Sequence, residues 1–442
     1  MLPGPFNYDR IWLGSGWPAV QSDGDESAAA DKETPVKKQI ATILLCCAVL
    51  ATIPARALGM EAVADGLRQV EQYNFSIHIL AMLLVGFGFL MVFVKKYGYS
   101  ATTGTYLVVA TGIPLYLLVR SWGGLSAESV EPSSVKSLLF AEFACASALI
   151  AMGAVLGRLR LHQYALLAAL LVPAYAVNEW LVLDGGLGVT RGFVDSAGSI
   201  VIHAFGAYFG LGLALFLTNQ GHRQMTVEAD PTSDRFSMLG SMVLWIFWPS
   251  FCSAVVPPAE VPRTAIATIL ALSGSTLSTF LVSTLLRKGK PSFADMANAA
   301  LAGGVAVGAT CNLVSPAGAF AIGLLAGSLC VVGYTLIQPR LDSSLKIVDT
   351  CGVHNLHGMP GLLGGLTAAV VVPGIAKAQL VGIAFTVVFA FGAGATAGYL
   401  IKLVGAKSAA YEDDEFVGVS PSSPVCDSDD HDALVTASSP LS

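Results

Sequence analysis

Charged residues are scarce in this sequence. Asp, Glu, Lys and Arg make up 12% of its 442 residues, about half the share expected of a soluble domain, whereas 54% of the residues are hydrophobic. Residues 296–339 contain none of the four charged types. A chain of this composition would not be soluble as a globule. The sequence therefore predicts a polytopic membrane protein built from helices.

Signatures of disulfides and of metal centres are also missing. The eight cysteines form no CxxC pair and no zinc spacing, and seven of them lie in or beside apolar runs, where a free cysteine acts as a small hydrophobe. There is no HExxH motif. We expect no cofactor and no metal. One alternative stays open, because His354 and His357 could share a metal ion with Asp349 or Cys351, as in an intramembrane metalloenzyme.

Twelve apolar runs are long enough to be read as membrane spans. They cover residues 39–56, 75–94, 101–120, 137–157, 163–183, 195–218, 236–257, 264–286, 294–311, 317–338, 350–374 and 379–402. The first is the least certain, because the small residues that end it also resemble a signal-peptide cleavage site. Its distance from Met1 argues against a signal peptide.

The basic residues predict how the chain crosses the membrane. If both termini are cytoplasmic, 17 of the 24 Lys and Arg residues lie on the cytoplasmic side and seven lie outside, in agreement with the positive-inside rule. We therefore expect a cytoplasmic segment at residues 1–38, a transmembrane domain at 39–403 and a cytoplasmic tail at 404–442. Residues 408–442 hold eight acidic residues and no Lys or Arg, so this tail is expected to be disordered.

Histidines inside apolar runs are the most informative feature of the chain. His203 follows Asp195, and both His354 and His357 follow Asp349. Titratable side chains are costly in the hydrocarbon layer and usually mark a path for a substrate or a proton. An aspartate followed by a histidine in each half of the chain suggests a pore built from two repeats.

Several motifs together carry a resemblance to a known family. They are residues 86–91, 95–98, 142–143, 153–157, 176–179, 202–210, 248–251, 301–308 and 349–361. Over residues 75–403 the chain resembles an Rh glycoprotein, a member of the eukaryotic branch of the ammonium transporter superfamily. Cys252 departs from the pattern, since many relatives have asparagine after the phenylalanine at position 251. The first 38 residues and the acidic tail are not covered by the resemblance.

The resemblance implies a fold and a set of site residues. The expected fold is all-helical, with two inverted five-helix halves, flanking helices and one pore in each subunit of a homotrimer. By motif, the resemblance assigns paired pore histidines (His203 and His354), a stacked phenylalanine gate (Phe143 and Phe251), an acidic group at the outer vestibule (Glu179) and a buried aspartate (Asp195).

The function implied by the resemblance is transport and not catalysis. Ammonium would gather at the outer mouth and neutral ammonia would cross the pore. The protein would lie in the lipid bilayer of the plasma membrane and bind no nucleic acid. A carbon dioxide channel and a proton-coupled ammonium transporter are alternatives for the same pore. An ammonium sensor or scaffold is an alternative of a different class.

The candidate residues also have readings that need no function. Each histidine taken alone could be a satisfied packing residue, and we interpret His357 and His78 as packing or helix-contact residues. Asp195 could simply cap the helix that carries His203. The two phenylalanines could be ordinary core or lipid-facing rings, and Glu179 could be an interfacial group that reaches water.

Overall fold

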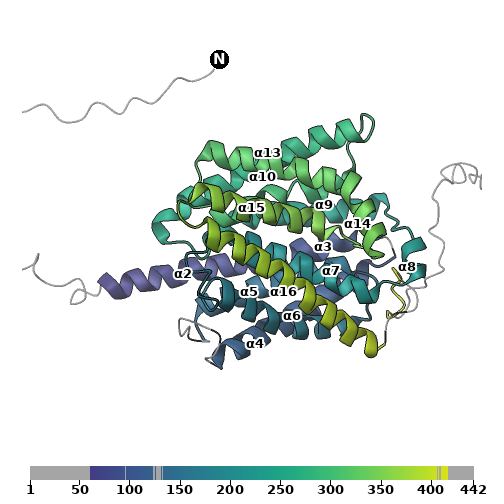
Figure 1. The fold of residues 1–442 in the computed structure, drawn as a ribbon, viewed down its shortest axis with the longest axis horizontal. Helices are drawn as coiled ribbons and strands as arrows, with labels where there is room; N and C mark the ends of the chain where they lie inside the picture. The colour runs from purple at the N-terminus through teal and green to yellow at the C-terminus, as the bar shows by residue number, and fades with distance from the viewer. Residues whose placement is uncertain are drawn as a thin grey trace, which may run out of the picture. The chain divides into compact units, whose positions relative to one another are not determined.

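A computed structural model of the protein describes residues 60–94, 96–122, 125, 131, 133–405, 407 and 410–416. The N-terminal segment 1–38 and the predicted first span, 39–56, lie outside these residues. The chain divides into two compact units, Met1–Ala64 and Asp65–Ser442, and the account below concerns the second. Its described residues form an all-helical bundle (Figure 1).

Long helices make up most of the bundle. They are α2 (Met60–Ala81), α4 (Gly98–Ser121), α5 (Val135–Ala154), α6 (Leu161–Val182), α7 (Phe205–Leu217), α9 (Pro231–Ser253), α10 (Val261–Leu286), α13 (Pro316–Val332), α15 (Met359–Val371) and α16 (Ala376–Leu403). Shorter segments extend or join them: η1 (Met82–Phe87), α3 (Gly88–Leu90), η2 (Met91–Phe93), η3 (Ser199–Ala204), α8 (Gln220–Gln224), η4 (Pro258–Glu260), α11 (Phe293–Ala299), α12 (Ala302–Val307), η5 (Gly308–Thr310), η6 (Gly333–Ile337), α14 (Gln338–Leu345) and η7 (His354–Gly358).

Nine helices of the described residues are long and apolar enough to cross a membrane. Ten of the twelve predicted spans coincide with helices of the structure, with ends that differ mostly by a few residues. The predicted all-helical polytopic fold is therefore confirmed for the described residues.

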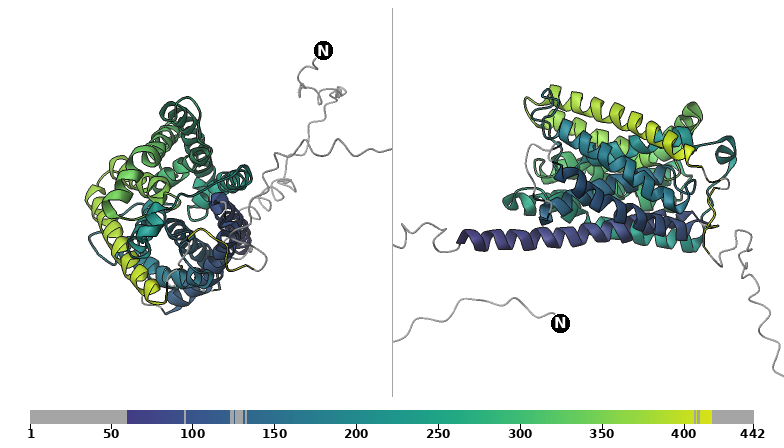
Figure 2. Two further views of the ribbon diagram at one scale, coloured as in Figure 1. Left: turned by 90° about the vertical axis from the view of Figure 1, so that its right-hand side faces the viewer. Right: turned by 90° about the horizontal axis from the view of Figure 1, so that it is seen from below.

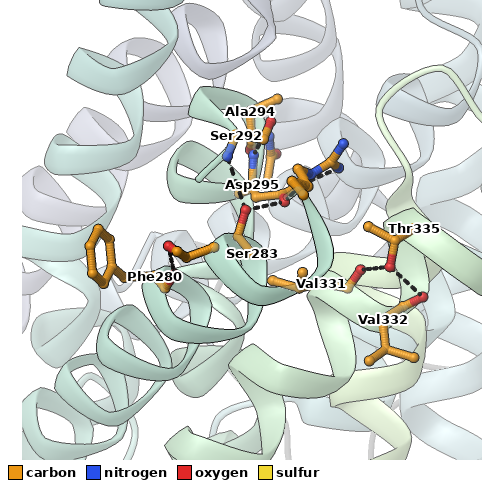
Figure 3. Close-up of polar contacts among 11 residues, drawn as sticks. Phe280, Ser283, Ser292, Ala294, Asp295, Val331, Val332 and Thr335 are labelled. Atoms are coloured by element: carbon orange, nitrogen blue, oxygen red, sulfur yellow. Dashed lines mark hydrogen bonds and ion pairs between the residues drawn. The ribbon is translucent and has the colours of Figure 1, made fainter. Parts of the chain in front are cut away.

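One predicted span, 294–311, is broken into the short helices α11 and α12. The turn before α11 is fixed by a polar cluster around Asp295, whose carboxylate is bound by Arg287 at 2.6 and 2.8 Å and by the Ser283 hydroxyl at 2.6 Å (Figure 3). Further on, Gly303 packs against the backbone of Ala271 on α10, where a Cβ atom would collide. The break thus depends on contacts with α10, and this run of the sequence has no proline and Asp295 as its one charged residue.

The bundle consists of two halves, α2 to α7 and α9 to α15, followed by α16. Helix α4 packs on α6 in the first half, as α10 packs on α13 in the second, and η3 contacts η7 where the halves meet. Because each half contains five crossings, an odd number, the second half enters the membrane from the opposite side and is inverted relative to the first. Helix α16 runs alongside α7 (Figure 2).

Glycines bring neighbouring helices into backbone contact. A Cβ atom at Gly394 of α16 would meet the carbonyl of Phe209 on α7, and one at Gly212 of α7 would meet the carbonyl of Phe391 on α16. In lipid, where apolar burial gives little drive for association, such close packing is a main source of helix association. Gly392, two residues before Gly394, faces open space.

Part of the predicted tail lies on the bundle. The Asp413 carboxylate accepts hydrogen bonds from the backbone N–H groups of Tyr99, at 3.1 Å, and Ser100, at 2.9 Å. Glu415 accepts one from the N–H of Leu161, at 2.7 Å. These acids occupy the N-terminal ends of α4 and α6, where the helix dipole favours negative charge. Residues 407 and 410–416 are called the C-terminal strap below; 417–442 lie outside the described residues.

Candidate functional site

Two buried aspartates begin the helical segments that carry the histidines. The Oδ2 atom of Asp195 accepts hydrogen bonds from the N–H groups of Ile200, at 2.9 Å, and Val201, at 2.8 Å. Asp349 does the same for η7, since its two oxygens accept from the N–H groups four and five residues further on, both at 3.0 Å. Each carboxylate thus satisfies the free donors at one helix start inside the bundle.

The two segments share one sequence pattern. Asp195 is followed by Gly198 and His203 at the same spacings as Asp349 is followed by Gly352 and His357, which gives D-x-x-G-x-x-x-x-H in both. The two glycines have φ of +77° and +67°, in the left-handed region that other residues seldom adopt. This repeated spacing was the signal in the sequence that identifies the second histidine.

His203 and His357 form a pair in the interior of the bundle. Their Nδ1 atoms lie 3.2 Å apart, their ring centroids are 5.3 Å apart, and their planes are within 6° of each other. Both residues are buried, at 3% and 5% exposure. The predicted pairing of His203 with His354 was therefore wrong, and so was the interpretation of His357 as a packing residue.

His354 lies at the first position of η7 and does not reach this pair. Its backbone N–H is bound to Asp349, and its ring meets the edge of Tyr208 with centroids 5.8 Å apart. The His354 Nδ1 atom is buried and has no hydrogen-bond partner in the part of the chain that the structure describes. Because η7 is wound as a π-helix, it is the histidine eight residues after the aspartate that faces the other half.

The contact between the two Nδ1 atoms fixes the chemistry of the pair. One ring must carry the hydrogen on Nδ1 and the other must accept it, so the two neutral imidazoles are opposite tautomers. One Nε2 atom is then an acceptor and the other is a donor. The Nε2 of His203 is buried and has no partner among the described residues, so it is available to a passing molecule.

Aromatic rings continue the site on the side of His203. Trp248 stacks on His203, with centroids 5.7 Å apart and planes 18° apart, and Phe251 lies 6.0 Å from the same imidazole. Phe143 of α5 contacts Phe251 of α9 at 4.7 Å, with planes tilted by 56°. The structure thus brings the two predicted gate residues together, next to the first histidine.

A small chamber lies on the side of His357. Phe87 stacks on this histidine at 6.3 Å. The chamber has a volume of about 20 Å³ and is lined mainly by apolar side chains, with Asn298 as a polar exception. This is room for one or two molecules of the size of water or ammonia. The pair therefore stands between a phenylalanine contact and an apolar chamber.

Glu179 lies near the end of α6, away from these rings. It is 5% exposed, accepts a hydrogen bond from the Tyr116 hydroxyl at 2.6 Å and lies 3.6 Å from the Arg120 guanidinium. Asp184 lies 3.6 Å from the same guanidinium. The predicted vestibule acid is thus the buried member of a charged cluster whose other members, Arg120 and Asp184, are partly exposed.

A metal centre finds no support in this geometry. Within the described part of the chain, no group of three or more His, Cys, Asp or Glu side chains is arranged to hold a metal ion.

Comparison with known proteins gives the family. The sequence model of the Ammonium Transporter Family matches residues 41–419. The chain belongs to this family. It is an Rh-type member, because it is 41% identical over 357 residues to ammonium transporter Rh type B of Oryctolagus cuniculus, an alignment that covers 73% of this chain and 76% of the rabbit protein. The human Rh type B protein is 42% identical over 310 residues, 68% of this chain and 66% of that protein.

Solved structures agree with this assignment. Rh50 of Nitrosomonas europaea, described with a mechanism of conduction by the Rhesus protein family of channels, is 62% identical with a TM-score of 0.79; the match covers 80% of this chain and 94% of that chain. A sensor Amt protein, 20% identical with a TM-score of 0.69, covers 78% of this chain and 95% of its own, and shows the fold alone. The family is one of transporters, so this Rh-type member is a multi-pass membrane protein and not an enzyme.

Proposed function

We propose that the protein is an ammonium transporter whose pore conducts neutral ammonia past the His203–His357 pair. The observation that carries the proposal is the contact between the two Nδ1 atoms, which leaves one donor and one acceptor Nε2. Ammonia has one lone pair and three N–H groups, so it can bind to both kinds of nitrogen. A molecule crossing this point exchanges water for imidazole without losing all of its hydrogen bonds.

The surroundings of the pair favour the neutral form. The rings in contact with it are those of Trp248, Phe251 and Phe87. An uncompensated ammonium ion in such an environment loses its hydration at a cost of several kcal/mol, whereas ammonia loses only ordinary hydrogen bonds. Ammonium must therefore give up its proton to water on the side of entry before it reaches the pair, and net movement through the pore is electroneutral.

Recruitment belongs to the end of the bundle where α6 finishes, which we propose is the outer mouth. Glu179 adds negative charge there, although it shares that charge with Arg120 and with the Tyr116 hydroxyl. The faces of Phe143 and Phe251 offer cation-π attraction worth about 0.5–2 kcal/mol to an arriving ammonium ion. These groups raise the local ammonium concentration ahead of deprotonation.

The test is a flux assay in reconstituted vesicles that records internal pH and current together. An inward ammonium gradient should make the vesicle interior alkaline, faster than in empty vesicles, with almost no current. A current that grows in proportion to the flux would show that the ion itself crosses and would favour proton-coupled or ammonium transport.

Carbon dioxide is the second neutral solute that we consider for this pore. It has no N–H group and accepts hydrogen bonds weakly, so it gains little from the His203–His357 pair. We propose that ammonia is the preferred solute. In vesicles loaded with carbonic anhydrase, acidification by carbon dioxide should be the same with and without the protein; an increase that His203→Ala removes would contradict this preference.

The assembly and orientation implied by the resemblance are also proposals. A homotrimer with three separate pores would have three times the 45.8 kDa mass of the chain, which native mass spectrometry measures directly. We also propose that the termini are cytoplasmic and that the protein lies in the plasma membrane. In intact cells, a tag placed after Ser442 should then be protected from added protease.

A further inference from the structure

Helix α2 is hydrogen-bonded to the helix that carries Phe143. The Ser76 hydroxyl donates to Oε1 of Glu142 at 2.6 Å, and Glu142 directly precedes Phe143 on α5. Ser76 and Glu142 are both fully buried. The second carboxyl oxygen of Glu142 is buried and has no partner within the described ranges, so the bond from Ser76 is what holds this carboxyl group.

The same part of α2 is bonded to the helix that carries Phe251. The His78 Nδ1 atom lies 2.9 Å from the hydroxyl of Ser250, which directly precedes Phe251 on α9. The His78 ring also stacks on Phe247, one turn earlier on α9, with centroids 4.9 Å apart and planes 21° apart. His78 therefore contacts α9 at two positions that lie about one helical turn apart.

Further along, the continuation of α2 is locked to α9 by backbone contact. A Cβ atom at Gly240 of α9 would collide with the backbone of Gly86 and Leu90, and the Ser237 hydroxyl donates to the Leu90 carbonyl at 2.8 Å. These contacts fix the two helices relative to each other, because the close backbone packing leaves no room for one helix to slide along the other. The side-chain hydrogen bonds of Ser76 and His78 then attach α2 to α5 and α9 next to the contact between the two phenylalanines.

We propose that Ser76 and His78 are positioning residues that set the distance between the phenylalanine rings and so limit the size of the amine that can pass. The inference rests on the proposed role of Phe143 and Phe251 as a gate. With Ser76 bonded to α5 and His78 bonded to α9, the rings can part only by rotating about their own side-chain bonds. That motion admits ammonia, whereas a larger amine needs the helices themselves to separate.

The experiment compares methylamine with ammonia, because methylamine is a base of similar chemistry with one more methyl group. Vesicles containing the protein are exposed to a gradient of each amine, and the ratio of the two fluxes is taken from the rate of internal alkalinisation. Ser76→Ala should raise the methylamine-to-ammonia ratio about two- to tenfold, the population change permitted by the loss of one net hydrogen bond. Ser76→Thr keeps a hydroxyl and should retain the wild-type ratio.

The bond to α9 is tested from both of its ends. His78→Phe keeps the stacked ring and removes the bond, and Ser250→Ala removes the same bond from the other side. Each should raise the ratio, and the double variant should raise it no further, since both changes delete one interaction. The matched control is Ser328→Ala, a half-buried serine of α13 whose hydroxyl donates to Leu324 of its own helix at 2.8 Å. Its ratio should equal that of the wild type.

Failure of the gate and failure of the positioning role give different results. If Phe143→Ala and Phe251→Ala leave the ratio unchanged, the gate itself is wrong. If those two variants raise the ratio while Ser76→Ala, His78→Phe and Ser250→Ala keep the wild-type value at wild-type thermal stability, the positioning role is overturned. Because two residues report on one bond, misfolding of a single variant leaves the second to decide the question.

Discussion

Each imidazole of the His203–His357 pair keeps the other in a single tautomer. This coupling predicts that the two residues act as one unit. His203→Ala and His357→Ala should each lower ammonia flux by about tenfold or more, because each leaves a buried ring nitrogen without its partner, which costs about 1–3 kcal/mol. The double variant should be little worse than either single variant. Flux per folded protein in vesicles measures all three.

His354 is the control for this prediction, since it is a histidine of the same π-helical segment that contacts Tyr208 and not His203. His354→Ala should keep most of the wild-type flux. Additive losses from His203 and His357, or a loss in His354→Ala equal to theirs, would contradict the assigned pair.

Glu179 gives a second prediction at the scale of single residues. Glu179→Gln should raise the ammonium concentration needed for half-maximal flux and leave the maximal flux almost unchanged, because the residue attracts cations and does not line the pair. Asp184→Asn removes one negative charge beside the same Arg120 and serves as the matched control. Equal shifts in both variants would mean that the total charge of the mouth matters and Glu179 has no special place.

The sequence allowed most of these residues to be named but not all of their partners. Phe143, Phe251 and His203 were assigned by motif, and the structure places them in one column. The second histidine was missed because two candidates lie three residues apart, and a regular α-helix does not show which one faces the other half. The spacing from Asp349, compared with the spacing from Asp195 to His203, carries that information.

At the scale of helices, the contact of α7 with α16 depends on the absence of side chains. Gly394→Ala should destabilise the protein by about 1–3 kcal/mol, because the new methyl group would collide with the Phe209 carbonyl and push the helices apart. Gly392→Ala places the same methyl group in open space on the same helix and should be neutral or slightly stabilising. Thermal unfolding in detergent measures the difference.

Equal unfolding temperatures for Gly394→Ala and Gly392→Ala would contradict the packing argument.

Helix boundaries were predicted well where they depend on the sequence itself and less well where they depend on contacts between helices. Continuous apolar runs such as residues 379–402 were placed to within three residues of the observed α16. The break between α11 and α12 was not predicted, because it is produced by contact with α10 and by the Asp295 cluster at the start of the run.

At the scale of the whole molecule, the C-terminal strap connects the end of the chain to the starts of α4 and α6. A stop after Gly405 removes the strap and should lower the free energy of unfolding by about 2 kcal/mol, since each helix loses a carboxylate cap worth about 1 kcal/mol. A stop after Phe416 keeps the strap and should unfold like the full chain. Thermal unfolding of both truncations, measured in the same detergent, would reveal whether the strap contributes.

The D-x-x-G-x-x-x-x-H segment occurs once in each inverted half, so a solute that approaches the imidazoles from either side of the membrane meets nearly the same chemistry. Such a centre does not favour transport in one direction over the other. Swapping the inside and outside solutions should give the same conductance, and the direction of net flow should follow the ammonia gradient alone. Under the proposed placement of Glu179 at the outer mouth, any rectification must come from the difference between its charged cluster and the apolar chamber beside Phe87.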